Sequence, residues 1–287
     1  MSLSTIRPSS AQSGRLWALR TAFLLMGFTF SVTQAVMLRA FLVAFSGNEL
    51  SIGLVLAGWL ILEAVGSGLL GRLADRPALR RILTRFLLPL EGVGEGPRAF
   101  ALLQLILALM LPLSLYAAFT VRRLVGVIPG VGVDLGTMAW ASWLILAPLG
   151  LVDGVMFTCG CRAYARLQGE TGSAGRVYSL EALGGIAGGL LLTYVFIPYL
   201  DALQIVLVLV TLNIASATSL VAWAARGSRL RCVCGPLLAL LTVAAYLLFF
   251  QSGGLQQGLC RQQWPGYELL FCDESIYGKV TVICREN

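Results

Sequence analysis

The sequence predicts an all-α integral membrane protein with a short C-terminal β-hairpin, and two features of the chain support this prediction. Only 12% of its 287 residues are charged while 57% are hydrophobic, and the mean hydropathy is +0.83. Soluble domains carry about 25% charged residues. The chain also contains seven apolar segments, each long enough to cross a hydrocarbon core about 30 Å thick as a helix. We therefore expect one bundle of about seven transmembrane helices.

The seven expected spans follow one another with short connections. They run approximately over residues 20–45, 50–71, 99–120, 137–160, 179–199, 203–225 and 233–250. Backbone groups in lipid must satisfy their own hydrogen bonds, so each span is expected to be a helix. The chain then divides into a cytoplasmic N-terminal segment (1–19), a transmembrane helical domain (20–250) and an extramembrane tail (251–287).

The distribution of arginine predicts the orientation of the bundle. The net charge is +7, and Lys279 is the one lysine in the chain. Fifteen arginines flank the spans on one side: Arg7, Arg15, Arg20, Arg72, Arg76, Arg80, Arg81, Arg85, Arg98, Arg162, Arg166, Arg176, Arg226, Arg229 and Arg231. The loops of the other side hold Arg122 and Arg123. The positive-inside rule places the N-terminus in the cytoplasm, and seven spans then place the tail outside.

Because these arginines lie beside apolar segments, the expected partner of the basic surface is the lipid bilayer, and nucleic-acid binding is not expected. No cofactor is expected either. The chain has no histidine, so a Ser-His or Cys-His catalytic arrangement is excluded. A metal site would need Cys, Asp or Glu alone. Two Cys-x-Cys pairs, Cys159/Cys161 and Cys232/Cys234, have the wrong spacing for a typical zinc site and are interpreted as small buried hydrophobic residues.

Five polar residues fall inside the expected spans, where a central charge costs at least about 2.5–3.5 kcal/mol on insertion scales. They are Gln34, Arg39, Glu63, Asp153 and Glu181. Glu63 is near the middle of its span, whereas Glu181 is expected close to the interface. Arg39 is near enough to the end of its span to snorkel or to pair with Glu49. Two interpretations stay open: a structural network that fixes helix packing, or a proton or substrate path with Glu63 as its best candidate.

Small residues spaced four apart predict close helix packing in the second and fifth spans. Such residues let helix backbones approach where lipid provides no hydrophobic driving force. The glycines concerned are Gly66, Gly68, Gly71, Gly184, Gly185, Gly188 and Gly189. A phosphate-binding loop is the alternative for the run at 184–189, but the run continues into leucines rather than opening a polar loop.

The tail changes character after residue 250. Two β-rich runs, 267–272 and 279–284, are separated by a polar turn and predict a hairpin. An isolated hairpin is marginal in water, so we expect it to be the start of a larger unit. Cys260, Cys272 and Cys284 can supply one disulfide if the tail is outside.

Several segments resemble one family. Residues 33–42 (TQAVMLRAFL), 45–50 (FSGNEL) and 53–68 resemble the first two spans of bacterial proteins that fuse a major facilitator-like (MFS-like) membrane domain to a spermidine-synthase-like domain. Residues 175–184 (GRVYSLEALG) resemble the start of a later span in that family. The loop motif GRLADR, with Gly71, Arg72, Asp75 and Arg76, is similar to the cytoplasmic loop signature of major facilitator transporters. Residues 273–282 (DESIYGKVTV) resemble the first hairpin of a spermidine synthase domain.

The resemblance implies a multi-pass protein of the bacterial inner membrane that anchors or feeds an aminopropyltransferase-type domain, with a polyamine as the possible small-molecule partner. Ala40 stands where related proteins often carry glutamate, and the family's catalytic half has no counterpart in these residues, so no catalytic residue is carried over. The expected role is therefore that of a membrane anchor. The alternatives are a small MFS-like transporter module with a substrate or proton path through the bundle, and a purely structural scaffold.

Overall fold

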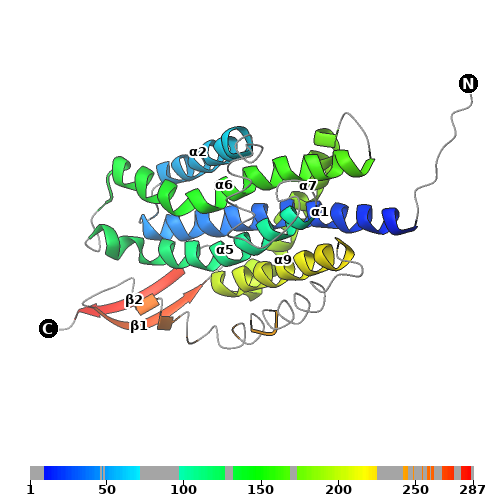
Figure 1. Ribbon diagram of the computed structural model, residues 1–287. Helices are drawn as coiled ribbons and strands as arrows, with labels where there is room; N and C mark the ends of the chain where they lie inside the picture. The colour runs from blue at the N-terminus through cyan, green and yellow to red at the C-terminus, as the bar shows by residue number, and fades with distance from the viewer. Residues whose placement is uncertain are drawn as a thin grey trace, which may run out of the picture.

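The computed structural model describes residues 10–45, 47, 49–71, 97–126, 132–168, 173–224, 242–244, 248, 254, 257, 258, 260, 261, 267–274 and 279–285. These residues form a bundle of long helices and one two-stranded antiparallel sheet (Figure 1). The helical elements are α1 (Ser10–Ala44), α2 (Leu50–Val65), η1 (Gly66–Leu70), α5 (Pro97–Val125), α6 (Leu135–Gln168), α7 (Ser173–Leu191), η2 (Leu192–Phe196), α8 (Ile197–Tyr199) and α9 (Ala202–Ala224). The π-helical turns η1 and η2 continue α2 and α7 without a break in the helical path.

Six of these helices are long and apolar enough to cross a membrane. They cover Leu16–Ala44, Leu50–Leu70, Pro97–Val125, Leu135–Gln168, Ser173–Tyr199 and Ala202–Val221. The first six expected spans are therefore confirmed as long apolar helices. The seventh expected span, 233–250, lies mostly outside the described residues. The helices α5, α6 and α7 begin or end several residues beyond the expected spans, because polar residues at helix ends prolong a helix past the hydrocarbon-length segment that hydropathy detects.

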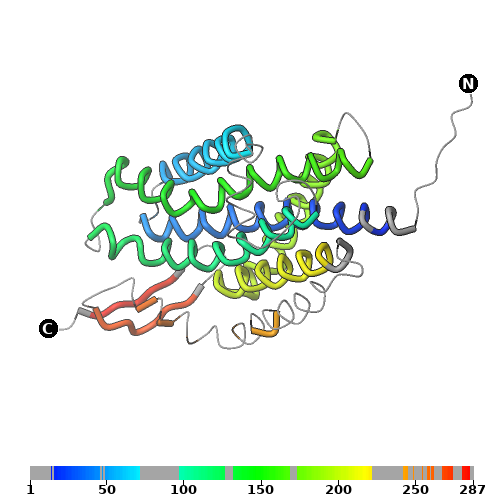
Figure 2. Tube along the Cα trace, in the orientation of Figure 1, coloured from blue at the N-terminus to red at the C-terminus, as the bar shows by residue number. Residues whose placement is uncertain are grey.

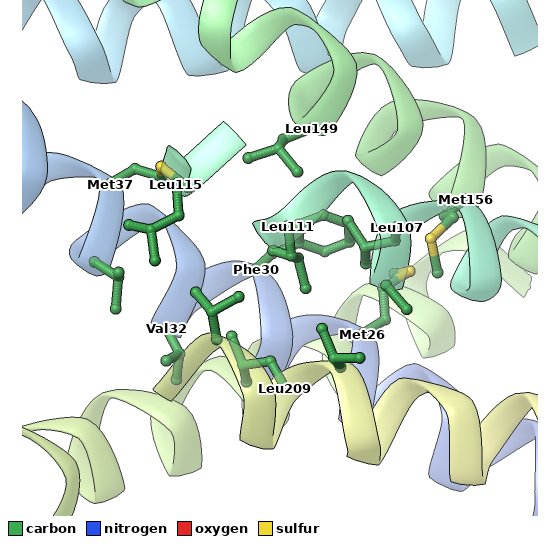
Figure 3. Packing of buried hydrophobic residues seen from close by; sticks show 14 of the residues in the cluster. Met26, Phe30, Val32, Met37, Leu107, Leu111, Leu115, Leu149, Met156 and Leu209 are labelled. Atoms are coloured by element: carbon green, nitrogen blue, oxygen red, sulfur yellow. The ribbon is translucent and has the colours of Figure 1, made fainter. Parts of the chain in front are cut away.

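The helix α1 lies inside the bundle and packs along α7, α9 and α5, whereas α6 packs along α2 and α5 (Figures 1 and 2). The buried face of α1 contributes Met26, Phe30 and Met37 to one apolar core. Leu107 and Leu111 from α5, Leu149 from α6 and Leu209 from α9 complete the cluster (Figure 3). The core therefore holds α5, α6 and α9 together around α1, and α2 and α7 flank it.

The flanking helices α2 and α7 present apolar side chains outward. Leu60, Leu69, Leu183, Ile186 and Leu190 are all more than half exposed. Leaving apolar area exposed to water costs about 25 cal/mol per Å² relative to burying it. In lipid it carries no such cost, so the outward face of these helices suits a membrane environment.

The C-terminal strands β1 (Tyr267–Glu274) and β2 (Lys279–Arg285) form the expected hairpin, with a β-bulge between Leu269 and Phe271. A disulfide joins Cys260 to Cys272, and Cys284 is exposed and not part of a disulfide. The hairpin lies at the end of the bundle where α1 and α5 finish and α6 begins, opposite to the start of α1 (Figure 1). This is the end that the arginine distribution assigns to the outside.

Candidate functional site: an acid cluster between three helices

Three of the five intramembrane candidates come together from three different helices. The carboxyl group of Asp153 on α6 interacts electrostatically with those of Glu63 on α2 and Glu181 on α7. Glu63 and Glu181 also interact with each other. We call these residues the acid cluster. Nothing in the spacing of the sequence relates residues 63, 153 and 181, so only the packing of the helices creates the cluster.

Asp153 is the most enclosed member of the acid cluster. Its side chain is only 3% exposed, while Glu63 and Glu181 are partly buried. The indole N–H of Trp59, one helical turn before Glu63, donates a hydrogen bond to the Asp153 carboxyl group. The other carboxyl oxygen, Oδ1, has no hydrogen-bond partner among the described residues. A buried carboxyl group is thus left with one unsatisfied acceptor, an arrangement that costs about 1–3 kcal/mol or more unless something binds there.

Two glycines of α6 bring Asp153 against α2. A Cβ atom added to Gly154 would overlap the backbone of α2 at Glu63 and Ser67, and one added to Gly150 would lie 2.7 Å from the Cβ of Leu62. The α2 side of the same contact is Gly66, where an added Cβ would overlap the backbone at Leu151. Because both helices present small residues here, their backbones touch, and the carboxyl groups of neighbouring residues are held at a fixed spacing.

A second close contact holds Glu181 in place. Its backbone carbonyl lies directly against Gly27 of α1, where an added Cβ would overlap it. One turn further along α7, Gly184 meets the carbonyl oxygen of Leu24, and Gly188 approaches that of Phe28, 2.9 Å from an added Cβ. Phe30, one turn after Gly27, packs edge-on against Trp59 with ring centroids 6.3 Å apart. The α1 side chain that packs on Trp59, the hydrogen-bond donor to Asp153, is therefore aromatic.

The other predicted packing glycines differ in how closely neighbouring atoms surround them. Gly71 is tightly enclosed, since an added Cβ would lie 2.9 Å from a methyl group of Thr158. Gly185 has only ordinary contacts, at 3.8 Å, and nothing lies within 4 Å of an added Cβ at Gly68 or Gly189. The small-residue pattern thus marks the right helices, and the direction each glycine faces decides which of them makes a contact.

Gln34 and Arg39 are not part of the acid cluster. Both lie on α1 and are partly buried, and neither is among the groups that interact electrostatically with the three carboxyl groups. Gly71 accepts a 3.0 Å hydrogen bond from the Arg162 guanidinium through its carbonyl oxygen. The other residues of the loop motif, Arg72, Asp75 and Arg76, lie outside the described residues.

The acid cluster has no positive counterpart among the described residues. No arginine, lysine or other cation interacts with Glu63, Asp153 or Glu181 within the part of the chain that the structure describes. Up to three negative charges therefore gather in the bundle. Such charges are strongly disfavoured in a low-dielectric interior unless protons or a cation neutralise them.

The cluster is also not a metal-binding set. Among the described residues, no group of three or more His, Cys, Asp or Glu side chains is placed to hold a metal ion. The carboxyl groups are thus within electrostatic range of one another but do not converge as ligands of one ion. Cys159 and Cys161 on α6 are not part of a disulfide, whereas Cys232 and Cys234 fall outside the described residues.

Two features of the interior were missed by sequence reasoning. Trp59 passes as an ordinary apolar residue of its span, and only its contact with Asp153 shows its role. Asn213 on α9 is fully buried and donates a 2.9 Å hydrogen bond to the hydroxyl of Thr29 on α1. A polar amide inside an apolar span was a detectable signal for this second contact.

Comparisons with protein-family models, with curated proteins and with solved structures found no match for this chain. The resemblance to the fused synthase-like proteins stays a prediction from the sequence. The chemistry of the acid cluster therefore carries the functional argument.

Proposed function

We propose that the helical bundle is a transporter-like module in which a cation or a proton crosses the membrane through the acid cluster. One observation carries the proposal: Glu63, Asp153 and Glu181 bring three carboxyl groups together from three helices, with no cation among the described residues to neutralise them. Intramembrane acidic residues that face a bundle interior mark ion pathways and proton relays.

The geometry favours this proposal over a purely structural network. A structural network is expected to satisfy its buried polar atoms, because an unsatisfied acceptor costs stability. Asn213 and Thr29 make such a contact across α9 and α1. The Oδ1 atoms of Asn213 and Asp153 both have no partner among the described residues, but of the two only Asp153 is acidic and interacts with two further carboxyl groups, so its position favours ligand binding over stability.

The proposal is tested by the charge that the protein moves. Purified chain is reconstituted into liposomes, and currents on a solid-supported membrane are measured after imposed gradients of protons, sodium and methylammonium. The wild type is expected to give a protein-dependent current with at least one of these cations. A variant carrying Glu63→Gln, Asp153→Asn and Glu181→Gln is expected to give none.

The matched control is Glu49→Gln, which removes an exposed carboxyl group just before α2. Its current is expected to equal that of the wild type. Equal currents from the triple variant, or none from the wild type with all three cations, would contradict the proposal.

A second candidate function rests on the hairpin. Leu270, Phe271, Val280 and Val282 are exposed on a sheet of only two strands, which favours packing against further protein. The chain would then anchor a synthase-like domain, as the resemblance implies. Sequencing the gene beyond the codon for Asn287 tests this: a continuing frame that encodes a glycine-rich nucleotide-binding unit would support it, and a stop codon would contradict it.

A further inference from the structure

We propose that the ligand of the acid cluster is the proton, and that Asp153 is its central binding group, with Glu63 and Glu181 as the two groups that exchange protons with it. This inference rests on the transporter-like function proposed above and names the species that the site binds. It follows from the enclosure of Asp153, the absence of a metal-ligand arrangement among the described residues, and the two carboxyl groups, of Glu63 on α2 and Glu181 on α7, that interact with Asp153.

The enclosure of Asp153 favours a ligand that needs no room. The side chain is 3% exposed, and Gly150 and Gly154 bring α6 into direct contact with α2 and η1, so a bulky ligand would fit only if these helices separated. A proton on the unpartnered Oδ1 atom removes the charge without adding a heavy atom. Protonation also turns the unsatisfied acceptor into a hydrogen-bond donor. The same proton can then be transferred to a neighbouring carboxylate.

The spacing of the three carboxyl groups favours single protons over one shared metal ion. Metal ions such as Ca²⁺ require several oxygen atoms to converge at about 2.3–2.6 Å. The described residues show no such convergence of three ligands. Protons, by contrast, neutralise carboxyl groups one at a time, and groups within electrostatic range influence each other's occupancy.

The flanking groups can supply a route. Glu63 comes from α2 and Glu181 from α7, each partly buried and each interacting with Asp153. On α6 itself the nearest titratable groups are Cys159, Cys161 and Arg162, and of these Cys161 interacts with Glu181. From α1, the described contacts near Trp59 are aromatic, through Phe30. Among the described residues, the two glutamates are therefore the acidic groups that can exchange a proton with Asp153.

The test uses dicyclohexylcarbodiimide on the full chain in detergent micelles. This reagent reacts with a protonated carboxyl group: the acid proton moves to a carbodiimide nitrogen, the carboxylate oxygen bonds to the central carbon, and the acyl group then migrates to nitrogen to give a stable N-acylurea. No atom is lost. Peptide mass spectrometry across a pH series is expected to find the adduct on Asp153 or its two partners, at least tenfold above Glu49.

Two further arms make the result decisive. Asp153→Asn is expected to remove the adduct from position 153, and Asp153→Glu to restore it, while both variants keep the helical far-UV circular dichroism spectrum of the wild type. Modification that is unaffected when sodium chloride replaces choline chloride supports the proton. Protection of the cluster by sodium, or modification no greater than that of Glu49 over the whole pH series, would overturn the inference.

The two proposals fail in different ways. Sodium or methylammonium currents without carbodiimide modification of the cluster would keep the transporter-like function and reject the proton as ligand. Modification as expected, with no current for any cation, would keep the proton-binding site and reject transport.

Discussion

Asp134 shows how a single side chain defines the start of a long helix. It precedes α6, and its Oδ2 atom accepts a 2.8 Å hydrogen bond from the backbone N–H of Thr137. The hydroxyl and the backbone N–H of Thr137 lower the pKa of Asp134 below its ordinary value of 3.8. This is the N-cap arrangement, in which a carboxylate satisfies a helix N–H that has no partner within the helix.

The lowered pKa of Asp134 predicts a pH-dependent end of α6. Since the folded pKa lies below the unfolded one, the cap is fully stabilising above the unfolded value and is lost as pH falls through the folded value. Hydrogen exchange, corrected for the intrinsic pH effect, is expected to show falling protection at Gly136 to Met138 on acidification. Asp134→Asn can still cap but does not titrate, so its protection should be flat over the same range; an equal acid loss in that variant would contradict this role.

At the scale of elements, the bundle depends on two pairs of closely packed helices, α1 with α7 and α2 with α6. Gly27 and Gly184 form the contact of the first pair, and Gly66 and Gly154 that of the second. Each pair carries one or two acidic residues of the cluster beside its contact. The same backbone approach that stabilises the helices in lipid therefore sets the distances between the carboxyl groups.

Two glycines of α7 make a matched test of this packing. Gly184→Ala places a methyl group on the carbonyl of Leu24, so the free energy of unfolding is expected to fall by about 1–3 kcal/mol, the usual cost of overpacking. Gly189→Ala meets nothing within 4 Å and gains helix propensity of up to about 1 kcal/mol. SDS-titration unfolding curves of the two variants provide the comparison. Equal effects of both changes would mean that α1 and α7 are not in close contact.

For the whole molecule, the helical class and its elements could be predicted from the sequence, and the acid cluster could not. Lipid demands long apolar helices, so hydropathy alone located the six described spans. The residues Glu63, Asp153 and Glu181 were recognisable one by one because acids are costly in lipid. Their assembly depends on which faces of α2, α6 and α7 meet. Glu63 is 118 positions from Glu181 and 90 from Asp153, so no local sequence pattern shows that these faces come together. Glu181 belongs to the cluster as well, and its expected position near the interface stays a prediction.

The orientation of the whole molecule has its own test. The start of α1 and the hairpin lie at opposite ends of the bundle, and the Cys260–Cys272 disulfide fits an oxidising compartment. A membrane-impermeant maleimide added to intact spheroplasts is therefore expected to label the exposed thiol of Cys284. The matched control is a cysteine placed at Arg80, which should react only after permeabilisation. The reverse labelling pattern would show that the topology is inverted.

The central claim is that carboxyl groups from separate helices interact inside the bundle, and a double-mutant cycle tests it most directly. Unfolding free energies at alkaline pH, where the acids carry the most charge, are compared for wild type, Glu63→Gln, Asp153→Asn and the double variant. Repulsion between the two carboxylates means that the first amide relieves most of the strain and the second adds less. We expect a coupling energy of about 0.5–3 kcal/mol, the range for residues that interact directly. Strictly additive effects would show that Glu63 and Asp153 do not interact, and would contradict the account of the site.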